Sequence, residues 1–361
     1  MDWESFFKKN LEPVMAYQPG LREEQIREIA QTDDIFKLSS NESPLPPFPA
    51  ALEAMQRCLV TLNEYPDGSS HQLVKRLCEA YGLPPEQVIV GNGSNELIDD
   101  IAQTCLGPGD NVVYGAPSFV VYRSSAQIAG AQYREVPLDG HGCFDLEALL
   151  ASIDEHTKIV FVCSPNNPSG GVVSDAAFAR FMDAVPPHVL VVVDSAYQEF
   201  VEDMSALDAT RYFDGVRPLV VLRTFSKMYA LAGLRCGYGL APRELVATLN
   251  KVREPFNVNT VAQVAAAASF GDADEIARRR QLNATGRQSL YACFEELRLP
   301  FYRSEANFVW VMVPDAQGTF SSLLERGVIV RPFAGAQGLR VGVGDERGVA
   351  ATVAAFKELF G

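Results

Sequence analysis

The sequence predicts an α/β protein: a large domain with a mostly parallel, seven-stranded type of sheet sandwiched by helices, and a smaller α+β domain. Two observations support this prediction. Apolar runs of strand length, such as residues 159–163 and 189–193, alternate with segments of helical periodicity. Strands that are apolar on both faces are typical of parallel sheets covered by helices on both sides. After about residue 243 helices dominate the pattern, which indicates a separate unit.

The composition is that of a folded protein and narrows its possible partners. The chain has 361 residues, 47% hydrophobic and 21% charged, which is enough for two domains. Its net charge of −14 argues against nucleic acid or an anionic membrane as the main partner. No apolar run has the length of a membrane span, and the N-terminus does not resemble a signal peptide. The seven cysteines and four histidines are scattered, so we expect a reduced, cytoplasmic protein without a metal site.

The order of the predicted elements gives the domain boundaries. We expect residues 1–50 to form an N-terminal arm and part of the small domain, residues 51–245 the large domain, and residues 246–361 the small C-terminal domain. In the large domain we predict helices over residues 51–62, 71–81, 94–106, 119–129, 145–153 and 174–184, and strands over residues 88–90, 112–114, 132–137, 159–163, 189–193, 219–222 and 237–240. In the small domain we predict helices over residues 242–252, 261–270, 272–297, 318–326 and 348–359, and strands over residues 307–313, 328–331 and 340–343. The three arginines 278–280 are predicted to lie on a solvated helix face.

Polar residues follow several of the predicted strands, where ligands of open α/β sheets bind. Residues 91–96, GNGSNE, place glycines directly before a helix that begins at Ser94. Free N–H groups at such a helix start can bind an anion, although an ordinary tight turn would have the same pattern. Residues 164–170, SPNNPSG, form a rigid turn that can aim the side-chain amide of Asn167 into a site.

Two charged residues follow the strands at 189–193 and 219–222. Asp194 closes a wholly apolar strand, where a carboxylate is costly to bury without a partner. Lys227 lies in a cluster with Thr224 and Ser226, and Arg235 follows. Lys227 alone could be a solvated loop residue, but beside an acid, an amide and an anion-binding turn it is a candidate nucleophile.

These groups together fit the needs of pyridoxal phosphate. Its aldehyde requires a lysine, its ring nitrogen an acid, its 3-oxygen hydrogen-bond donors, and its phosphate a helix N-terminus with an arginine. The sequence therefore predicts a pyridoxal-phosphate site at the carboxyl ends of the strands.

The sequence also resembles a known family, the pyridoxal-phosphate aminotransferases of the aspartate aminotransferase fold. Within that family it most resembles the histidinol-phosphate aminotransferase group. The matching segments occur in the family's order over nearly the whole chain. They are YQPG (17–20), LSSNESP (38–44), YPDG (65–68), GNGSNE (91–96), APSF (116–119), SPNNPSG (164–170), DSAY (194–197), TFSKMYALAGLRCGYG (224–239) and GLRVGVG (338–344).

The resemblance implies a role for each matching position. Lys227 would bind the cofactor aldehyde and move a proton, Asp194 would pair with the ring nitrogen, and Tyr197 would bond the 3-oxygen together with Asn167. The resemblance implies further cofactor contacts at Gly93, Ser94, Asn95, Phe119, Thr224, Ser226 and Arg235, and at Tyr65 toward the neighbouring subunit of a homodimer. It implies substrate contacts at Tyr17, Asn41, Asn167, Arg331 and Arg340.

The reaction implied by the resemblance is transamination of small amino and keto acids. The preferred pair would be L-histidinol phosphate and 2-oxoglutarate, giving imidazole acetol phosphate and glutamate. An aromatic amino-acid aminotransferase is the nearest alternative, and a decarboxylase of a phosphorylated amino acid is a more distant one. A non-catalytic nucleotide-binding module, suggested by the glycine turn at 91–96, would leave Lys227 and Asp194 without a role.

Overall fold

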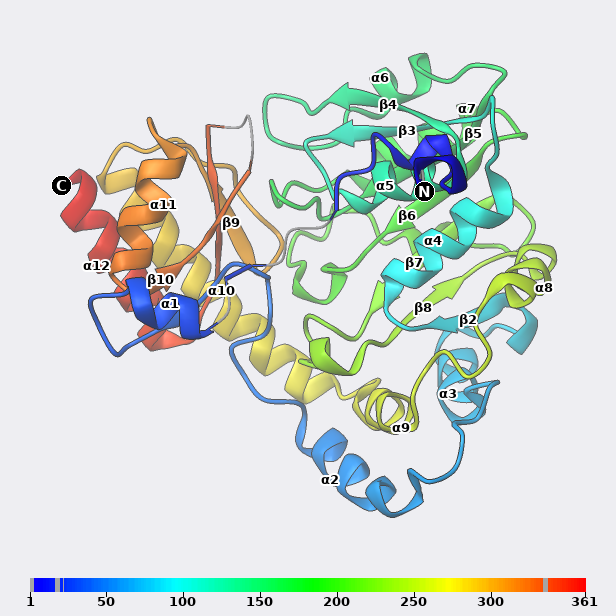
Figure 1. Cartoon of the computed structure of the whole chain (residues 1–361), viewed down its shortest axis with the longest axis horizontal. Coiled ribbons are helices and arrows are strands. Elements are labelled where there is room, and N and C mark those ends of the chain that lie inside the picture. The colour runs from blue at the N-terminus through cyan, green and yellow to red at the C-terminus, as the bar shows by residue number, and fades with distance from the viewer. Residues whose placement is uncertain (1–2, 17–19, 22, 334–336) are drawn as a thin grey trace.

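The computed structural model describes residues 3–16, 20–21, 23–333 and 337–361. Figure 1 shows a larger body built around a central sheet and a smaller body beside it, joined by the long helix α10 (Ala273–Glu296). Along the described part of the chain, every helix is too short or too polar to cross a membrane.

The larger body is organised around one sheet of seven strands in the described residues, in the order β2-β8-β7-β6-β5-β3-β4. Its strands are β2 (Val88–Gly91), β3 (Asn111–Ala116), β4 (Gln132–Pro137), β5 (Thr157–Cys163), β6 (Leu190–Asp194), β7 (Leu219–Thr224) and β8 (Gly237–Leu240). Neighbouring strands from β4 to β7 are parallel, and β8 is antiparallel to both β7 and β2. The predicted mostly parallel α/β fold is therefore confirmed. The central strands are buried on both faces, which explains their unbroken apolar sequence.

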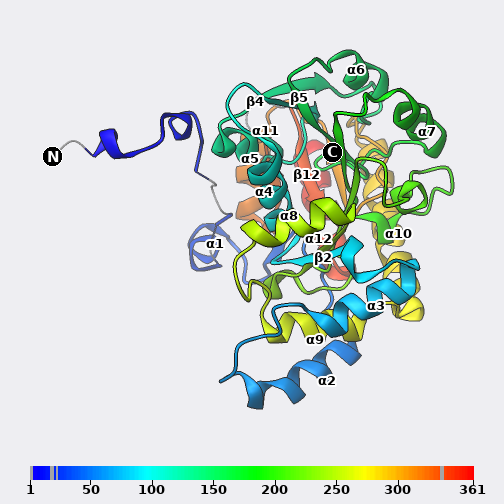
Figure 2. The ribbon, with the colours of Figure 1, turned by 90° about the vertical axis from the view of Figure 1, so that its right-hand side faces the viewer.

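Helices cover both faces of this sheet (Figures 1 and 2). The helices of the larger body are α2 (Pro49–Cys58), α3 (His71–Tyr81), α4 (Ser94–Cys105), α5 (Val121–Ala129), α6 (Leu146–Ala151), α7 (Asp175–Ala184), α8 (Arg243–Val252) and α9 (Thr260–Ser269). Of these, α2 and α9 pack against each other and lie beside the sheet rather than over one of its faces (Figures 1 and 2). Several begin at a side-chain cap: the side chains of Asp145, Ser174 and Asn259 accept hydrogen bonds from backbone N–H groups of α6, α7 and α9. By contrast α4 begins after Gly93, which has no side chain to cap it. Within the described residues no side chain caps this end of α4, so its first N–H groups can bind a ligand.

The smaller body has its own hydrophobic core. A three-stranded antiparallel sheet, in the order β11-β12-β9, packs on the helices of this body. Its elements are β9 (Phe308–Val311), α11 (Ala316–Glu325), β10 (Val328–Ile329), β11 (Arg331–Pro332), β12 (Leu339–Gly342) and α12 (Glu346–Phe360), together with the early segments α1 (Glu23–Ile29) and β1 (Phe36–Lys37). Strand β1 pairs in parallel with β10, so a segment near the N-terminus belongs to this body.

The packing differs from the predicted division of the chain at residue 245. Helices α8 and α9 contribute to the larger core, which also includes Phe270, because α9 packs closely against α2. The predicted solvated face of α10 is also wrong for Arg279, which is buried. The guanidinium of Arg279 lies 4.3 Å from the ring centre of Phe48, and its Nε donates to Glu275, so the arginine helps to join α10 to the larger body.

Candidate active site

The parallel strands of the larger body bring the predicted acid and lysine to one edge of the sheet. Asp194 is the last residue of β6, and Lys227 follows the end of β7 by three residues. The two strands are neighbours, with Asp194 opposite Leu222 in the register. The carboxyl ends of parallel strands lie at the same edge of the sheet, so residues far apart in the sequence come close together there.

Asp194 is a buried carboxylate with two different oxygens. Its Oδ2 accepts a 2.7 Å hydrogen bond from the hydroxyl of Tyr122, whereas its Oδ1 is buried and has no hydrogen-bond partner among the described residues. Burial raises the pKa of Asp194, while the Tyr122 hydroxyl, the backbone N–H of Ala196 and the charge of Lys227 act in the opposite direction. An unpartnered buried oxygen of this kind is costly unless a ligand donates to it.

Lys227 is half-buried beside the N-terminal loop. Its Nζ donates a 3.1 Å hydrogen bond to the carbonyl of Ser40 and lies 5.9 Å from the ring centre of Tyr197. Burial, followed by the positive charge of Arg340, lowers the pKa of Lys227 to about 8. A much larger fraction of this amine is therefore neutral near pH 7 than for an ordinary lysine, and the neutral amine is the nucleophile.

Tyr197 and Asn41 form a second polar pair in the site. The side-chain Nδ2 of Asn41 lies 3.0 Å from the Tyr197 hydroxyl, to which it donates. Burial raises the pKa of Tyr197, so its phenol stays protonated and can donate a hydrogen bond. Asn41 adopts a φ of 55°. Non-glycine residues rarely adopt this conformation, and those that do are frequently found at functional sites.

The start of α4 faces Arg235 and the hydroxyls that follow β7. A Cβ added to Gly93 would lie 2.6 Å from Nη2 of Arg235, so the absence of a side chain lets the guanidinium approach the helix start. Arg235 Nη1 donates to Ser226 Oγ at 3.4 Å, and the hydroxyls of Thr224 and Ser226 are 3.0 Å apart. Backbone N–H groups, hydroxyls and a guanidinium at one point are suited to a phosphate.

The smaller body contributes Arg340 from β12. The Arg340 guanidinium donates from Nη1 to Asn167 Oδ1 and from Nη2 to the carbonyl of Ser39. It lies 5.5 Å from the ring centre of Phe308 and 5.6 Å from that of Phe333. Arg331 on β11 is the register partner of Arg340, so both predicted substrate-binding arginines lie on the same small sheet.

The remaining predicted residues lie in different surroundings. Phe119 is half-buried, and its ring packs edge-on against Tyr122 at 5.8 Å; Asn95 is half-buried in the first turn of α4. Tyr65 is 83% exposed and stacks on Phe256. Tyr17 lies outside the described residues.

Some residues of the site were not identified from the sequence. Tyr122, which donates to Asp194, lies three residues after Phe119, and a tyrosine on a buried helix face needs a hydrogen-bond partner. That requirement could have drawn attention to it. The carbonyls of Ser39 and Ser40 could not have been found in this way, because any residue type offers a carbonyl.

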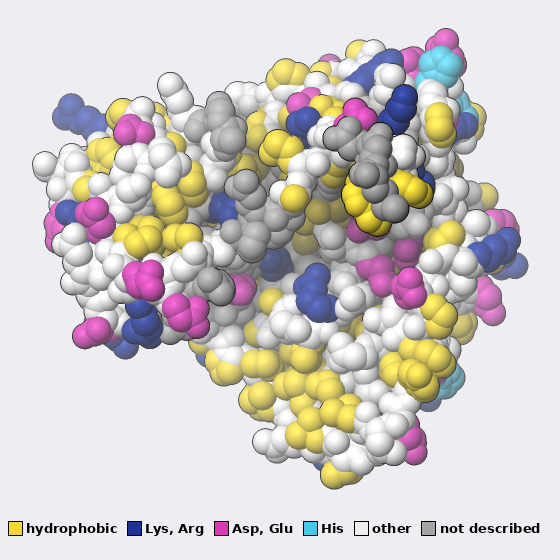
Figure 3. All heavy atoms as spheres, viewed as in Figure 1, with side chains coloured by type: hydrophobic (Ala, Val, Ile, Leu, Met, Phe, Trp, Pro, Cys, Tyr) yellow, Lys and Arg dark blue, Asp and Glu magenta, His cyan; other side chains and the backbone are white. Residues whose placement is uncertain are grey.

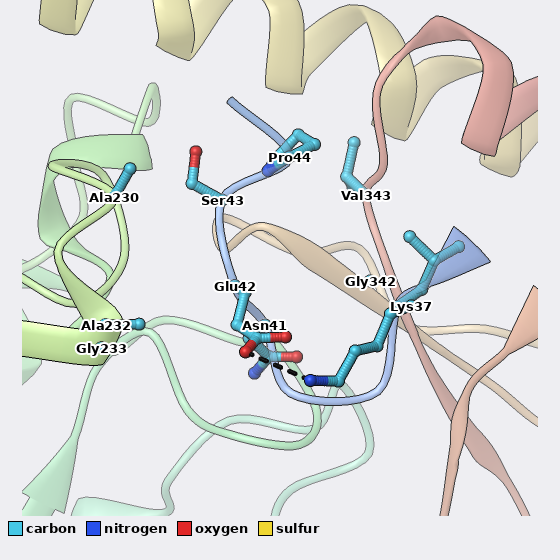
Figure 4. A pocket seen from close by; sticks show the side chains of 11 residues that line it. Lys37, Asn41, Glu42, Ser43, Pro44, Ala230, Ala232, Gly233, Gly342 and Val343 are labelled. Carbon is cyan, nitrogen blue, oxygen red and sulfur yellow. Dashed lines mark ion pairs between the residues drawn. The ribbon is translucent and has the colours of Figure 1, made fainter. Parts of the chain in front are cut away.

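A cavity of about 400 Å³ adjoins the site on the side of the N-terminal loop (Figure 4). It lies between the loop at residues 41–44, the turn that follows Lys227, and the end of β12. Its lining residues are Lys37, Leu38, Asn41, Glu42, Ser43, Pro44, Ala230, Ala232, Gly233, Gly342 and Val343. Lys37 and Glu42 form an ion pair of 3.6 Å across it. Figure 3 shows the surface hollowed between the two bodies, with lysine and arginine side chains in the hollow.

Comparison with known proteins identifies a family whose chemistry fits the groups in this site. Residues 33–356 match the family described as aminotransferase class I and II, and the chain belongs to this family. It is therefore an enzyme that transfers amino groups.

Individual relatives share nearly the whole chain. The histidinol-phosphate aminotransferase of Moorella thermoacetica is 40% identical over 351 residues, which cover 96% of this chain and 91% of the relative. That of Akkermansia muciniphila is 39% identical over 364 residues, covering 99% of this chain and 100% of the relative. The crystal structure of histidinol-phosphate aminotransferase from Sinorhizobium meliloti, in complex with pyridoxal-5'-phosphate, has a TM-score of 0.90 at 24% identity, and the match covers 99% of this chain and 98% of that chain. The predicted family resemblance is confirmed.

Proposed function

We propose that the chain catalyses pyridoxal-phosphate-dependent transamination, with L-histidinol phosphate and 2-oxoglutarate converted to imidazole acetol phosphate and glutamate. The family membership supports amino-group transfer, and the curated relatives at about 40% identity carry the name of this reaction. The larger and the smaller body both contribute side chains to the candidate site, and these side chains have the chemical groups that the proposed reaction would use.

The observation that carries the proposal is the pair formed by Lys227 and Asp194. One is an amine whose pKa is lowered to about 8, and the other is a buried carboxylate with an oxygen that no described residue hydrogen-bonds. Pyridoxal phosphate presents an aldehyde to the first and a ring N–H to the second, so the residues present fit this cofactor. A nucleotide-binding module would need neither group.

When bound, pyridoxal phosphate supplies an electron-accepting ring conjugated to the substrate nitrogen. Lys227 would bind the cofactor aldehyde and, once displaced by the amino donor, would accept the proton that leaves the substrate α-carbon at its Nζ. Asp194 Oδ1 would hold a proton at the ring nitrogen. Tyr197 and Asn167 would donate to the 3-oxygen, and Phe119 would pack against the ring.

The phosphate of the cofactor would lie at the start of α4. Backbone N–H groups of Ser94 and Asn95, beyond the open turn at Gly93, would bind its oxygens, and Thr224, Ser226 and Arg235 would complete the cradle. Asn41, Arg331 and Arg340 would bind the anionic end of the substrate, as would Tyr17.

We further propose a homodimer that works in the cytoplasm. Hydrophobic side chains gather over α2 and the residues after it (Figure 3), where Leu59 and Val60 are exposed. Figure 2 shows the N-terminal segment projecting outward, with Trp3 and Phe6 also exposed. A second copy would cover these surfaces and receive Tyr65 at its phosphate site. The free state of all seven cysteines is compatible with a reducing compartment.

The proposed substrate is tested by comparing kcat/KM for L-histidinol phosphate and for phenylalanine, each with 2-oxoglutarate. We expect a clear preference for histidinol phosphate. A preference for phenylalanine would replace the substrate and keep the mechanism. Release of carbon dioxide from an added phosphorylated amino acid, without amino transfer, would indicate a decarboxylase. A colourless protein that does not respond to pyridoxal phosphate would refute the proposed function.

A further inference from the structure

Tyr122 is a completely buried phenol in direct contact with Asp194. It belongs to the first turn of α5 and stacks on Phe161 of β5, with ring centres 4.6 Å apart and planes 13° apart. Its hydroxyl lies 2.7 Å from Asp194 Oδ2. The stacked ring leaves the hydroxyl little freedom, because buried side chains are closely packed and occupy single rotamers.

The hydrogen bond makes the two oxygens of Asp194 unequal. Oδ2 accepts the hydrogen bond from Tyr122, whereas Oδ1 is buried and has no hydrogen-bond partner in the part of the chain that the structure describes. A carboxylate with one oxygen fixed in this way cannot rotate without breaking a buried, charge-assisted hydrogen bond. The arrangement therefore directs Oδ1 at a donor that is brought by a ligand.

We propose that Tyr122 is a positioning residue that directs Asp194 Oδ1 at the cofactor ring nitrogen and keeps their shared proton on that nitrogen. This inference rests on the proposed function, because it takes pyridoxal phosphate as the ligand. It assigns to α5 a role that reaches the cofactor only through Asp194.

The physical argument concerns where the shared proton resides. In a buried site the proton can stay on the ring nitrogen, leaving a charged pair, or move to Asp194, leaving two neutral groups. Burial favours the neutral arrangement. A hydrogen bond donated to the carboxylate stabilises its ionised form and so favours the charged pair. A protonated ring nitrogen is the better acceptor of electrons.

Tyr122 is well suited to this task because it stays neutral. Burial, and then the charge of Asp194, raises the pKa of Tyr122 well above its ordinary value, so the phenol remains a donor. Among the described residues, the other titratable groups that interact with Asp194 are Cys163, Tyr197 and Lys227. Cys163 and Tyr197 stay neutral because burial raises their pKa values. Lys227 favours the ionised carboxylate only while its own amine is charged.

The chain contains a matched control for removing the hydroxyl. Tyr114 of β3 is also buried, and its hydroxyl donates a 2.8 Å hydrogen bond to the carboxylate of Glu135. Tyr122→Phe and Tyr114→Phe therefore each delete one oxygen atom and one hydrogen bond to a carboxylate, but only Tyr122 contacts Asp194. Thermal unfolding of the two variants shows whether they lose similar stability.

The decisive measurement is ¹⁵N NMR of each protein loaded with pyridoxal phosphate labelled at the ring nitrogen. We expect wild type and Tyr114→Phe to show a protonated nitrogen, and Tyr122→Phe a resonance moved toward neutral pyridine. Loss of a hydrogen bond to a charged group corresponds to about a tenfold or larger shift of such an equilibrium. We expect a matching, roughly tenfold rise in the dissociation constant of the cofactor. Equal resonances and dissociation constants in Tyr122→Phe and Tyr114→Phe would overturn the inference.

A double-mutant cycle separates positioning from packing. If Tyr122 acts through Asp194, Tyr122→Phe weakens cofactor binding in the wild-type background and has no further effect in Asp194→Ala. The same loss in both backgrounds would overturn the inference. Failure of wild type and Tyr114→Phe to bind the cofactor would instead refute the proposed function, and the inference with it.

If Tyr122→Phe does not fold, 3-fluorotyrosine at position 122 gives a second test. Its ring is nearly unchanged in volume, and its more acidic hydroxyl is a stronger donor. We expect it to raise the pH at which the cofactor nitrogen loses its proton, and an unchanged or lower pH would overturn the inference.

Discussion

The larger and the smaller body contribute to the site in different ways. Asp194 and Lys227 lie at or just after the ends of adjacent parallel strands of the larger body, so one sheet fixes both of the groups to which we assign the chemistry. Arg340 lies within a strand of the smaller body and reaches the site by donating to Asn167 and to the carbonyl of Ser39. The difference suggests that the larger body supplies the chemistry, whereas the smaller body supplies recognition of the substrate.

The largest effect is expected from Lys227→Ala. Loss of the amine should lower kcat by roughly 10⁴-fold, because general acid–base catalysis alone contributes up to that factor. Steady-state kinetics measure the loss, and borohydride reduction followed by mass spectrometry should no longer attach the cofactor to the chain. Lys37→Ala is the control, since Lys37 is half-exposed and paired with Glu42 in the neighbouring cavity; it should change kcat by about twofold at most. A variant at 227 with near-normal turnover would contradict the role given to the larger body.

A smaller effect, and of a different kind, is expected from Arg340→Gln. The loss of the charged, bidentate guanidinium donor should raise KM by about 100-fold, with a smaller change in kcat. Arg326→Gln, which removes a half-buried arginine paired with Glu358, controls for loss of charge on the smaller body. If Arg340→Gln lowered kcat and left KM unchanged, the two bodies would not divide chemistry and recognition as we propose.

The lowered pKa of Lys227 predicts a pH dependence of cofactor capture by the apoenzyme. The neutral amine reacts, so the rate should rise about tenfold per pH unit below the pKa of about 8 and level off above it. Stopped-flow absorbance measures this profile. Since Arg340 is the second cause of the lowered pKa, Arg340→Gln should move the profile to higher pH. A profile still rising at pH 10 in wild type would show that the amine has an ordinary pKa.

The smallest effect is expected from Gly93→Ala. Gly93 has a φ of +87°, and an added Cβ would meet the Arg235 guanidinium at 2.6 Å, so cofactor affinity should fall roughly fivefold from backbone strain and displacement of the arginine. Gly82→Ala is a matched control, because Gly82 also has a positive φ of +65° but nothing within 4 Å of an added Cβ. Equilibrium titration with pyridoxal phosphate compares the two. If Gly93→Ala and Gly82→Ala bound pyridoxal phosphate with equal affinity, the turn before α4 would have no role in binding the phosphate.

Much of the larger body could be predicted because its signals are local. Strand β6 is a run of β-branched residues buried on both faces, and Asp194 stands out as a charge at its end. The start of α4 is visible as glycines before Ser94. The packing of α9 against the larger core could not be predicted, because its alanine-rich face fits either core and only the contact with α2 decides.

The sequence by itself determined the alternation of buried strands and helices, and the residue types that follow each strand, because periodicity and turn chemistry are properties of short segments. Only the tertiary structure decided which of these groups meet. It placed the Tyr122 hydroxyl on Asp194, the Arg340 guanidinium on Asn167, and the Ser40 carbonyl on Lys227. Those contacts join segments far apart in the chain, and depend on how sheets and helices pack rather than on any local pattern.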